Sequence, residues 1–587
     1  MTSPAKSPGD VLQEITRSHA GMLEKLLRDL PSAGTADMAA LMRVFATADD
    51  RQLEKLRALE ETFYRDHLSL WGQMSAPPDG TTIPVAQSDN RFEAPEWRLP
   101  YFQYLQQAYL LNARFLLELG DLTDLEPQAK RRLQFQLRQL ADAMSPNNYA
   151  TTNPEVIKLA AQTGGESLAQ GMKLLAGDVA RGRISMTDEQ AFEVGRNLAI
   201  TPGSVVFENE VMQLIQYAPA SPEVHEYPLL IVPPFINKYY ILDLQPENSF
   251  VRFCVGQGFS TFIVSWRNIP PQLGQLAWDD YIEKGVFAPL EAIKAIRGAD
   301  KINALGFCVG GTLLSCALAV MAARNENRVA SLTLLATMLD FSETGDISVY
   351  VDREFVERSE QDFRQPGLMP GSKLASTFAT LRANDLIWHF VINNYLKGRP
   401  PRAFDLLYWN SDGSNLPGRL YAYYLRNMYL ENNLRIPGKL EASGVPLDLG
   451  AISVPAYVVA TREDHIVPWK SAYASVGLLG GRTEFVLGAS GHVAGIVNPA
   501  SKNRRHYWLN PSVASDADGW LAGATQHMGS WWKHWAGWLG NRSGDKMPAP
   551  ATAGSEQYPV IEAAPGRYVK EKSVWQHPAG QQKHIEE

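Results

Sequence analysis

The residue types and spacing best suited to chemistry in this chain are those of the hexapeptide Gly306–Gly311, centred on Cys308. An apolar segment at 302–305 with the character of a strand precedes it, and residues 312–320, with the character of a buried helix, follow it. A glycine two residues before and two residues after a central residue, between a strand and a helix, is the pattern of a nucleophile elbow. Small neighbours are needed because the turn is strained and projects its central side chain from the end of the sheet.

The central residue of this elbow is a cysteine, where most hydrolases carry a serine. The turn leads into a helix N-terminus, whose free N–H groups and positive dipole end favour a thiolate and an oxyanion. We therefore predict that Cys308 is a nucleophile; the alternative is a buried cysteine in a glycine-rich turn. The other two cysteines, Cys254 and Cys316, fall in apolar helical segments and are predicted to be core residues.

A cysteine nucleophile needs a base, and 11 histidines compete for that role. His492 lies in a loop directly after the last predicted core strand, and Asp464 lies in the loop after the strand before it. In α/β-hydrolases the chain order is nucleophile, acid, histidine, which Cys308, Asp464 and His492 reproduce. Asp464 is predicted to hold one ring nitrogen of His492 while the other takes the thiol proton. His465, next to Asp464, remains the alternative base, although it is better placed to hold its own loop.

The elements that must position these residues begin at about residue 194, where strands and helices alternate. This alternation predicts a mostly parallel sheet in an α/β domain. The predicted strands are 205–207 and 212–217 as a hairpin, followed by 228–232, 260–266, 302–305, 330–335, 454–460 and 482–487.

The alternation lapses between Leu335 and Val454. The intervening stretch, about 340–445, is rich in aromatic residues and mostly helical. An insertion of this length between two core strands commonly forms a cap over an active site. We predict a helical cap; a third independent domain is the alternative.

Residues 1–193 are predicted to form an all-helical N-terminal domain, and residues 194–587 the catalytic domain. Helical periodicity marks 11–30, 36–71, 101–119, 128–143 and 154–181. The helical block carries no cluster of His, Cys or Glu ligands, so it is interpreted as a packing or interaction domain. Binding of a membrane or granule surface by its apolar faces is the alternative.

The catalytic domain ends in a tryptophan-rich helical segment followed by a tail. Trp531, Trp535 and Trp538 share one helical face, which indicates packing against the core, with a polymer contact as the alternative. From about 541 to 587 we predict a C-terminal tail, rich in Pro, Ala, Gly and Ser up to Pro565 and laid over the surface.

Composition narrows the class of protein. A chain of 587 residues is too long for one core, and 45% hydrophobic with 20% charged residues is ordinary for a globular protein. The net charge of −8 argues against nucleic acid as the main partner. No apolar run is long enough for a transmembrane helix, and the first residues lack the apolar region of a secretory signal. Three cysteines suit a reducing compartment, so a cytoplasmic protein is expected. No metal site is predicted.

Several motifs together carry a resemblance to a known family. They are Leu105–Leu111, Thr152–Glu155, Asn197–Gly203, Ile236–Leu244, the Cys308 elbow, Tyr408–Asp412, Glu463–Trp469 and Ser490–His492. Over nearly its entire length the chain resembles the polyhydroxyalkanoate synthases, most closely the class I type. One departure is Phe235, where the family usually has tryptophan.

The resemblance implies an α/β-hydrolase catalytic domain behind an all-helical domain, with a triad of Cys308, His492 and Asp464. It also implies (3R)-hydroxyacyl-CoA substrates, release of free CoA, and a homodimer at the surface of cytoplasmic polyester granules. CoA enters as the acyl carrier of the substrate, and no other cofactor is expected.

A cysteine nucleophile agrees with this chemistry, because exchanging one thioester for another keeps the acyl group activated. His492 is the predicted base for the attacking hydroxyl; direct assistance by Asp464 is an open alternative. The oxyanion is predicted to bind the N–H of Val309 and a second N–H from the turn after the strand at 229–232, at Phe235.

Two competing functions remain at this stage. A cysteine-dependent acyl-CoA thioesterase or esterase shares the same site but uses water in place of the hydroxyl. A granule-coating protein without catalytic activity needs an amphipathic surface and no elbow.

Overall fold

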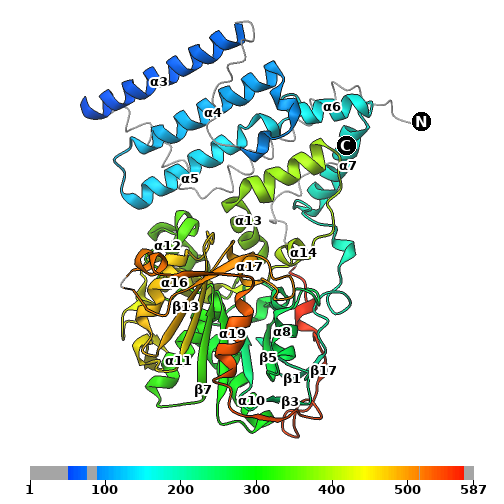
Figure 1. Ribbon diagram of the computed structural model, residues 1–587, viewed down its shortest axis with the longest axis vertical. Coiled ribbons are helices and arrows are strands. Elements are labelled where there is room, and N and C mark those ends of the chain that lie inside the picture. Colours follow the sequence, from blue (N-terminus) through cyan, green and yellow to red (C-terminus); the bar gives the residue numbers. More distant parts are fainter. Residues whose placement is uncertain (1–49, 76–88, 515, 574–587) are drawn as a thin grey trace. The chain divides into compact units, whose positions relative to one another are not determined.

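The computed structural model describes residues 50–75, 89–514 and 516–573. Its contacts divide the chain into two units (Figure 1). Unit 1 comprises Met1–Asp188 with Phe378–Arg402, and unit 2 comprises Glu189–Thr377 with Ala403–Glu587. The predicted boundary after residue 193 lies close to this division. The predicted insertion at about 340–445, by contrast, is shared between the two units.

Unit 1 is helical. Its helices are α3 (Asp50–Ser75), α4 (Pro100–Asp121), α5 (Pro127–Ala143), α6 (Pro154–Gln162) and α7 (Glu166–Arg181). Three of these helices, α4, α5 and α6, begin with a proline, at a position where the missing N–H costs nothing, as at Pro154 after its N-cap Asn153. The single helix predicted over 154–181 is wrong. Gly164 and Gly165 adopt φ of 58° and 89° there, which ends α6 and starts α7. The predicted helix at 11–30 and the first part of the one at 36–71 lie outside the described residues.

Residues 378–402 belong to unit 1 because their apolar side chains are buried with those of α6 and α7. They carry the end of α13 (Gly371–Leu381) and two wider turns of helix, η9 (Asn384–Trp388) and η10 (Val391–Leu396). Ile392 and Leu396 share a core with Val156 and Leu168. A side chain at Gly171 would lie 1.9 Å from the carbonyl oxygen of Tyr395, so only glycine permits this approach of α7. The predicted cap is thus smaller than the whole insertion.

Unit 2 is built on an 11-stranded sheet with the order β15-β14-β13-β12-β7-β6-β4-β5-β2-β1-β17. The six strands from β13 to β5 in this order are parallel, and the strands on both sides of them are antiparallel. The strand bounds are β1 (Gly203–Glu208), β2 (Met212–Tyr217), β4 (Leu229–Val232), β5 (Thr261–Trp266), β6 (Ile302–Phe307), β7 (Val329–Leu335), β12 (Ala456–Thr461), β13 (Thr483–Gly488), β14 (His506–Leu509), β15 (Thr525–Met528) and β17 (Glu562–Ala563). Every predicted strand is present, which confirms the predicted α/β class.

Helices cover both faces of the sheet (Figure 1). Successive residues of a strand point to opposite faces, and β4 shows this clearly. Leu230 and Val232 join the core that contains α10 (Ala288–Arg297) and α11 (Val309–Ala323). Leu229 and Ile231 join the core on the other face, which contains α8 (Phe250–Gly256) and α19 (Trp531–Gly540). The central strands are therefore apolar on both faces, as buried parallel strands are.

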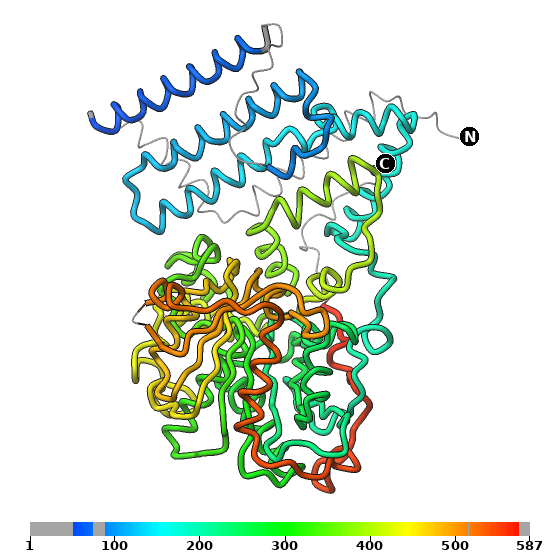
Figure 2. The backbone as a smooth tube through the Cα atoms, viewed as in Figure 1, coloured from blue at the N-terminus to red at the C-terminus, as the bar shows by residue number. Residues whose placement is uncertain are grey.

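The C-terminal segment beyond α19 belongs to this architecture and can be followed in Figure 2 as the red end of the tube. β16 (Lys546–Pro548) pairs with β3 (Glu223–His225), and β17 adds an antiparallel strand to the edge of the sheet at β1. A short helix, η15 (Tyr568–Lys570), follows with two buried residues. The predicted surface tail therefore contributes strands and core residues up to the last described position. Within the described ranges, the structure contains no helix of the length and apolarity that a membrane span requires.

Candidate active site

Cys308 occupies a strained turn between β6 and α11. Its φ of 52° and ψ of −128° lie in a region that a side chain rarely adopts and that costs on the order of 1–3 kcal/mol. Hydrogen bonds on both sides hold it there: its N–H donates to the Leu335 carbonyl at 2.8 Å, and its carbonyl accepts the Gly311 N–H at 2.9 Å. The backbone thus has the form of the predicted nucleophile elbow, and the thiol is partly exposed.

The flanking glycines are required by the close approach of neighbouring backbone. A Cβ at Gly306 would lie 2.3 Å from the Gly311 Cα, and one at Gly310 would lie 2.4 Å from the Val232 carbonyl oxygen. Real Cβ atoms do not come so close to backbone atoms. The glycine spacing in the sequence therefore reflects the packing of α11 against the ends of β6 and β4.

Asp464 and His492 meet at the same end of the sheet. Asp464 follows β12, and His492 opens the short helix α17 (His492–Ile496) after β13. The Asp464 Oδ2 lies 2.6 Å from Nδ1 of His492, which donates to the carboxylate. The other oxygen, Oδ1, accepts the N–H groups of Ile466 and Val467 at 2.9 and 2.8 Å. With its side chain fully buried and its oxygens occupied, Asp464 can hold the imidazole in one tautomer and orientation.

The His492 ring is nearly enclosed, with 10% of its side chain exposed, and it stacks on Phe307. Burial by itself lowers the pKa of His492. Charge interactions and hydrogen bonding with Asp464 and Cys308 outweigh burial, so the pKa is raised well above its usual value. Cys308 therefore lies close enough to the ring to act on its charge. An imidazolium between a carboxylate and a thiolate is the arrangement that a cysteine nucleophile uses.

His465 lies in the Asp464 loop but has a different environment. Its carbonyl oxygen accepts the Asp346 N–H at 3.3 Å and would lie 2.5 Å from a Cβ at Gly345. The residue thus helps to hold the loop, while the Asp464 carboxylate contacts His492. The structure brings Cys308, Asp464 and His492 together; their catalytic roles remain predictions.

The two predicted oxyanion donors come from different segments, the start of α11 and the turn after β4. Val309 is the first residue of α11, and the first N–H groups of a helix have no intrahelical acceptor. Phe235 follows β4 after two prolines, and its buried ring packs edge-on against Trp266, Trp278 and Tyr281. The role of both N–H groups remains a prediction.

Two tyrosines of the cap region were not assigned from the sequence. Tyr424 ends α15 (Gly418–Tyr424), and Tyr429 lies in the following turns, η11 (Leu425–Leu430). Burial raises the pKa of both hydroxyls, and a charge interaction with the nearby Cys308 raises the pKa further. The sequence does show a concentration of tyrosines at 421–429. It does not show which of their hydroxyls lie near Cys308.

Among the described residues, no group of three or more His, Cys, Asp or Glu side chains is arranged to hold a metal ion.

Comparisons with known proteins agree with the two parts of the chain. A family model described as "Poly-beta-hydroxybutyrate polymerase (PhaC) N-terminus" matches residues 88–254, and one described as "alpha/beta hydrolase fold" matches residues 227–499. A solved monoacylglycerol lipase from Paleococcus ferrophilus aligns with 57% of this chain at 11% identity and a TM-score of 0.33. So low a score supports no conclusion about function.

Curated relatives match much more closely. The chain is 50% identical over 526 residues to the "Poly(3-hydroxyalkanoate) polymerase subunit PhaC" of Cupriavidus necator, covering 88% of this chain and 89% of the relative. It is 40% identical to the protein of the same description from Rhizobium meliloti, over 83% of this chain and 80% of the relative. The "Poly(3-hydroxyalkanoate) polymerase" of Methylorubrum extorquens is 38% identical, over 89% and 87%.

Proposed function

The chain belongs to the poly(3-hydroxyalkanoate) polymerase family, and from this premise we propose that it polymerises (3R)-hydroxyacyl-CoA into polyester and releases CoA. The observation that carries the proposal is the position of Cys308, in a strained elbow within reach of the His492–Asp464 pair. A granule-coating protein without catalytic activity does not require a strained cysteine elbow next to a His–Asp pair.

Acylation is the first step. The thiol proton passes to Nε2 of His492, and the Cys308 thiolate attacks the carbonyl carbon of the acyl-CoA. The thioester bond to CoA breaks, a thioester to Cys308 forms, and the CoA thiolate takes the proton from His492. Asp464 stabilises the imidazolium that exists between these transfers. The N–H groups of Val309 and Phe235 receive the oxyanion.

Chain growth is the second step. His492 takes the proton from the hydroxyl of a bound hydroxyacyl unit, and that oxygen attacks the acyl group on Cys308. An oxygen ester forms, the thioester to Cys308 breaks, and the thiolate is regenerated. The step proceeds downhill because a thioester is a more activated acyl group than an oxygen ester, and a serine in the elbow would forfeit this difference.

The proposal extends to assembly and location. The protein acts as a homodimer at the surface of cytoplasmic polyester granules, and it needs no cofactor besides the CoA of its substrate. The resemblance to the polymerase family supports these features. Sedimentation of the purified protein tests the dimer, and co-pelleting with amorphous polyester, with and without competing detergent, tests binding to granules.

The activity is tested by incubating the protein with 3-hydroxybutyryl-CoA and measuring released thiol and insoluble polymer together. Both signals are expected from the wild type, and neither from Cys308→Ala. Thiol release without polymer identifies the cysteine thioesterase instead and overturns the proposal. The absence of both signals with the folded wild type supports the non-catalytic alternative.

A further inference from the structure

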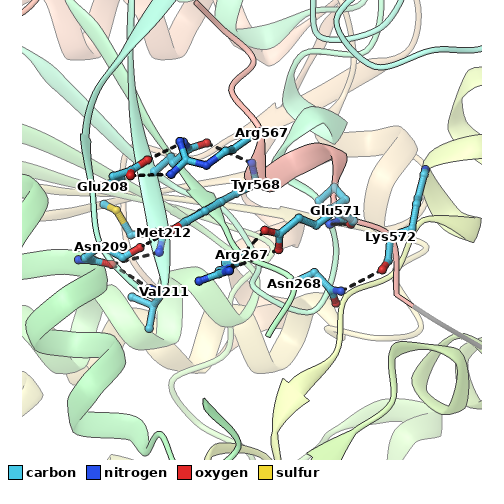
Figure 3. A network of polar contacts seen from close by, with 12 residues as sticks. Glu208, Asn209, Val211, Met212, Arg267, Asn268, Arg567, Tyr568, Glu571 and Lys572 are labelled. Carbon is cyan, nitrogen blue, oxygen red and sulfur yellow. Dashed lines mark hydrogen bonds and ion pairs between the residues drawn. The ribbon is translucent and has the colours of Figure 1, made fainter. Parts of the chain in front are cut away.

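Residues Arg567–Lys572, close to the end of the described chain, contact several loops of unit 2. Figure 3 shows part of this segment beside Arg267 and Asn268. We name this segment the C-terminal strap. It begins beside the sheet edge at β17 and contacts loops that follow β4, β5 and α14 (Asp405–Ser411). These contacts lie outside the Cys308, His492 and Asp464 constellation, and the proposed mechanism assigns them no role.

The contact with the turn after β4 is made by a buried lysine. The Lys238 ammonium, with 2% of the residue exposed, donates to the carbonyl oxygen of Glu571 at 2.7 Å. The carbonyl of Lys238 accepts the indole N–H of Trp409 at 2.8 Å. A buried cation is costly unless it is paired and hydrogen-bonded, so this lysine is retained against a substantial desolvation penalty.

The charge of Asp412 favours the ammonium form of the buried Lys238. Burial lowers the pKa of Lys238 to about 8, against the opposing attraction of Asp412. The Asp412 carboxylate is itself buried, accepts the Tyr240 hydroxyl at 2.9 Å, and pairs with the Lys572 ammonium at 3.0 Å. One carboxylate thus pairs with the lysine of the strap and also acts through its charge on the lysine of the turn after β4.

The loop after β5 fastens the other side of the strap. The Arg267 guanidinium lies 3.4 Å from the Glu571 carboxylate and over the ring of Tyr568. The Asn268 side chain donates to the Lys572 carbonyl at 3.1 Å and accepts the Asn415 N–H at 2.9 Å. Figure 3 shows Arg267 and Asn268, both from the loop after β5, beside Glu571 and Lys572 of the strap. The strap therefore bridges parts of the chain that are not connected to each other locally.

These bridges bear on catalysis because the turn they fasten contains the predicted second oxyanion donor. Phe235 lies three residues before Lys238, and the carbonyl of Ile236 accepts the Ser414 N–H at 3.2 Å. The same turn is thereby fixed to the strap by one residue and to the Asp412 segment by another. An oxyanion donor works only when it is held in advance at the position where charge develops.

We propose that Lys238 and Lys572 are positioning residues, which fix the Phe235–Lys238 turn through the C-terminal strap so that the Phe235 N–H meets the oxyanion. This inference rests on the proposed function for its catalytic consequence. Its structural consequence, a turn held by the strap, does not depend on that function.

Lys572→Met is the first test, because its side chain is 58% exposed and we expect its loss to leave the fold intact. Complete loss of an oxyanion donor costs about 10²–10³ in kcat, so a loosened donor should lower kcat about tenfold, with KM little changed. Lys572→Arg keeps the charge opposite Asp412 and should restore kcat. Lys470→Met is a matched control, since Lys470 is 55% exposed and pairs with Asp518 at 2.6 Å away from the strap.

Hydrogen exchange of the peptide covering residues 233–240 provides a readout that needs no activity. Exchange should be faster in Lys572→Met and Lys238→Met than in the wild type and in Lys470→Met. Should folded Lys572→Met keep both wild-type kcat and wild-type exchange, the inference is overturned. A wild type that releases no CoA contradicts the proposed function instead, and the exchange experiment still decides whether the strap holds the turn.

Discussion

Cys308, which precedes α11, and Cys316, in the middle of that helix, have opposite surroundings. Cys308 lies partly exposed at the elbow, whereas Cys316 is fully buried in the helix, where burial raises its pKa to about 12. A thiol in such a site is a packing group, because the thiolate is the reactive form.

We predict that Cys308→Ala abolishes CoA release while the protein stays folded. Cys316→Ala should keep much of the activity and lose some stability through a small cavity. CoA release and thermal unfolding, measured on both variants, check this. Substantial turnover by Cys308→Ala would remove the nucleophile assignment.

The two candidate bases can be separated in the same way. His492→Ala should lower CoA release by about 10²–10⁴-fold, since loss of a general base has that cost and the members of a triad act as a unit. His465→Ala should lower it far less and act mainly on stability, because its backbone holds the neighbouring loop. Steady-state rates of the two variants give the comparison. A dead His465→Ala beside an active His492→Ala would withdraw the Asp464 assignment as well.

The raised pKa of His492 makes stability depend on pH. The folded protein retains the proton to a higher pH than the unfolded chain, whose histidine has a pKa near 6.5. The stabilisation is therefore fully present below 6.5 and is lost as the pH rises through the folded value.

Denaturant unfolding of wild type and His492→Gln, which cannot titrate at this position, tests the dependence. The difference in their free energies of unfolding should be largest on the acid side of 6.5 and shrink as the pH rises. A difference that stays constant or grows with pH contradicts the charged pairing with Asp464 and Cys308.

At the scale of elements, the elbow depends on how closely α11 approaches β4. Gly310→Ala places a Cβ 2.4 Å from the Val232 carbonyl oxygen, so either the helix or the strand end must shift. We predict a loss of CoA release of at least about 10²-fold, as expected when the nucleophile and the oxyanion donors are displaced by about 1 Å.

Gly537→Ala is the control for that substitution. Gly537 lies on the exposed side of α19 with no atom within 4 Å of an added Cβ. Replacing it should raise stability by about 0.5–1 kcal/mol, because alanine is the better helix former, and should leave CoA release unchanged. Rates and unfolding curves of the two variants are compared. Wild-type activity in Gly310→Ala would show that the elbow tolerates the movement.

The tryptophan face of α19 packs against the core of unit 2. Its tryptophans at 531, 535 and 538 are buried, and the Trp535 indole donates to Thr333 of β7 at 3.0 Å. Trp535 also packs against Phe250 of α8. The packing interpretation of this face is therefore confirmed, since side chains enclosed by the sheet and α8 have no surface to offer a polymer.

At the scale of the whole molecule, the chain end belongs to the fold of unit 2. Val569 is buried in the core that contains α8 and α19. Arg567, two residues earlier, is half-exposed and pairs with Glu208 and Glu562. Val569 and Arg567 therefore allow the contributions of burial and of surface ion pairs to stability to be compared within one segment.

Val569→Ala should lower the free energy of unfolding by about 2 kcal/mol, from lost burial of two methyl groups and the cavity that remains. Arg567→Ala should lower it by less than about 1 kcal/mol, because ion pairs at the surface are screened by water. Chemical denaturation of both variants decides the order. The reverse order would mean that the segment is attached mainly by its charges.

The sequence by itself determined the features that depend on short stretches of chain. Compact apolar runs located the strands, and the glycine spacing around Cys308 located the elbow, because local sterics leave few residues able to adopt that turn. The order of Cys308, Asp464 and His492 followed from their places after successive strands. Parallel strands end at one edge of the sheet, so residues far apart in the chain are brought together there.

Only the tertiary structure decided the features that depend on distant partners. The local sequence of residues 378–402 does not indicate that their apolar faces pack against α6 and α7. Nor does the local sequence of β17 indicate that it pairs with β1. The link from Lys238 to Glu571 and Asp412 likewise joins segments separated by long stretches of chain. Such contacts depend on burial and charge pairing in the complete fold. They therefore cannot be predicted from the pattern of residues along the chain.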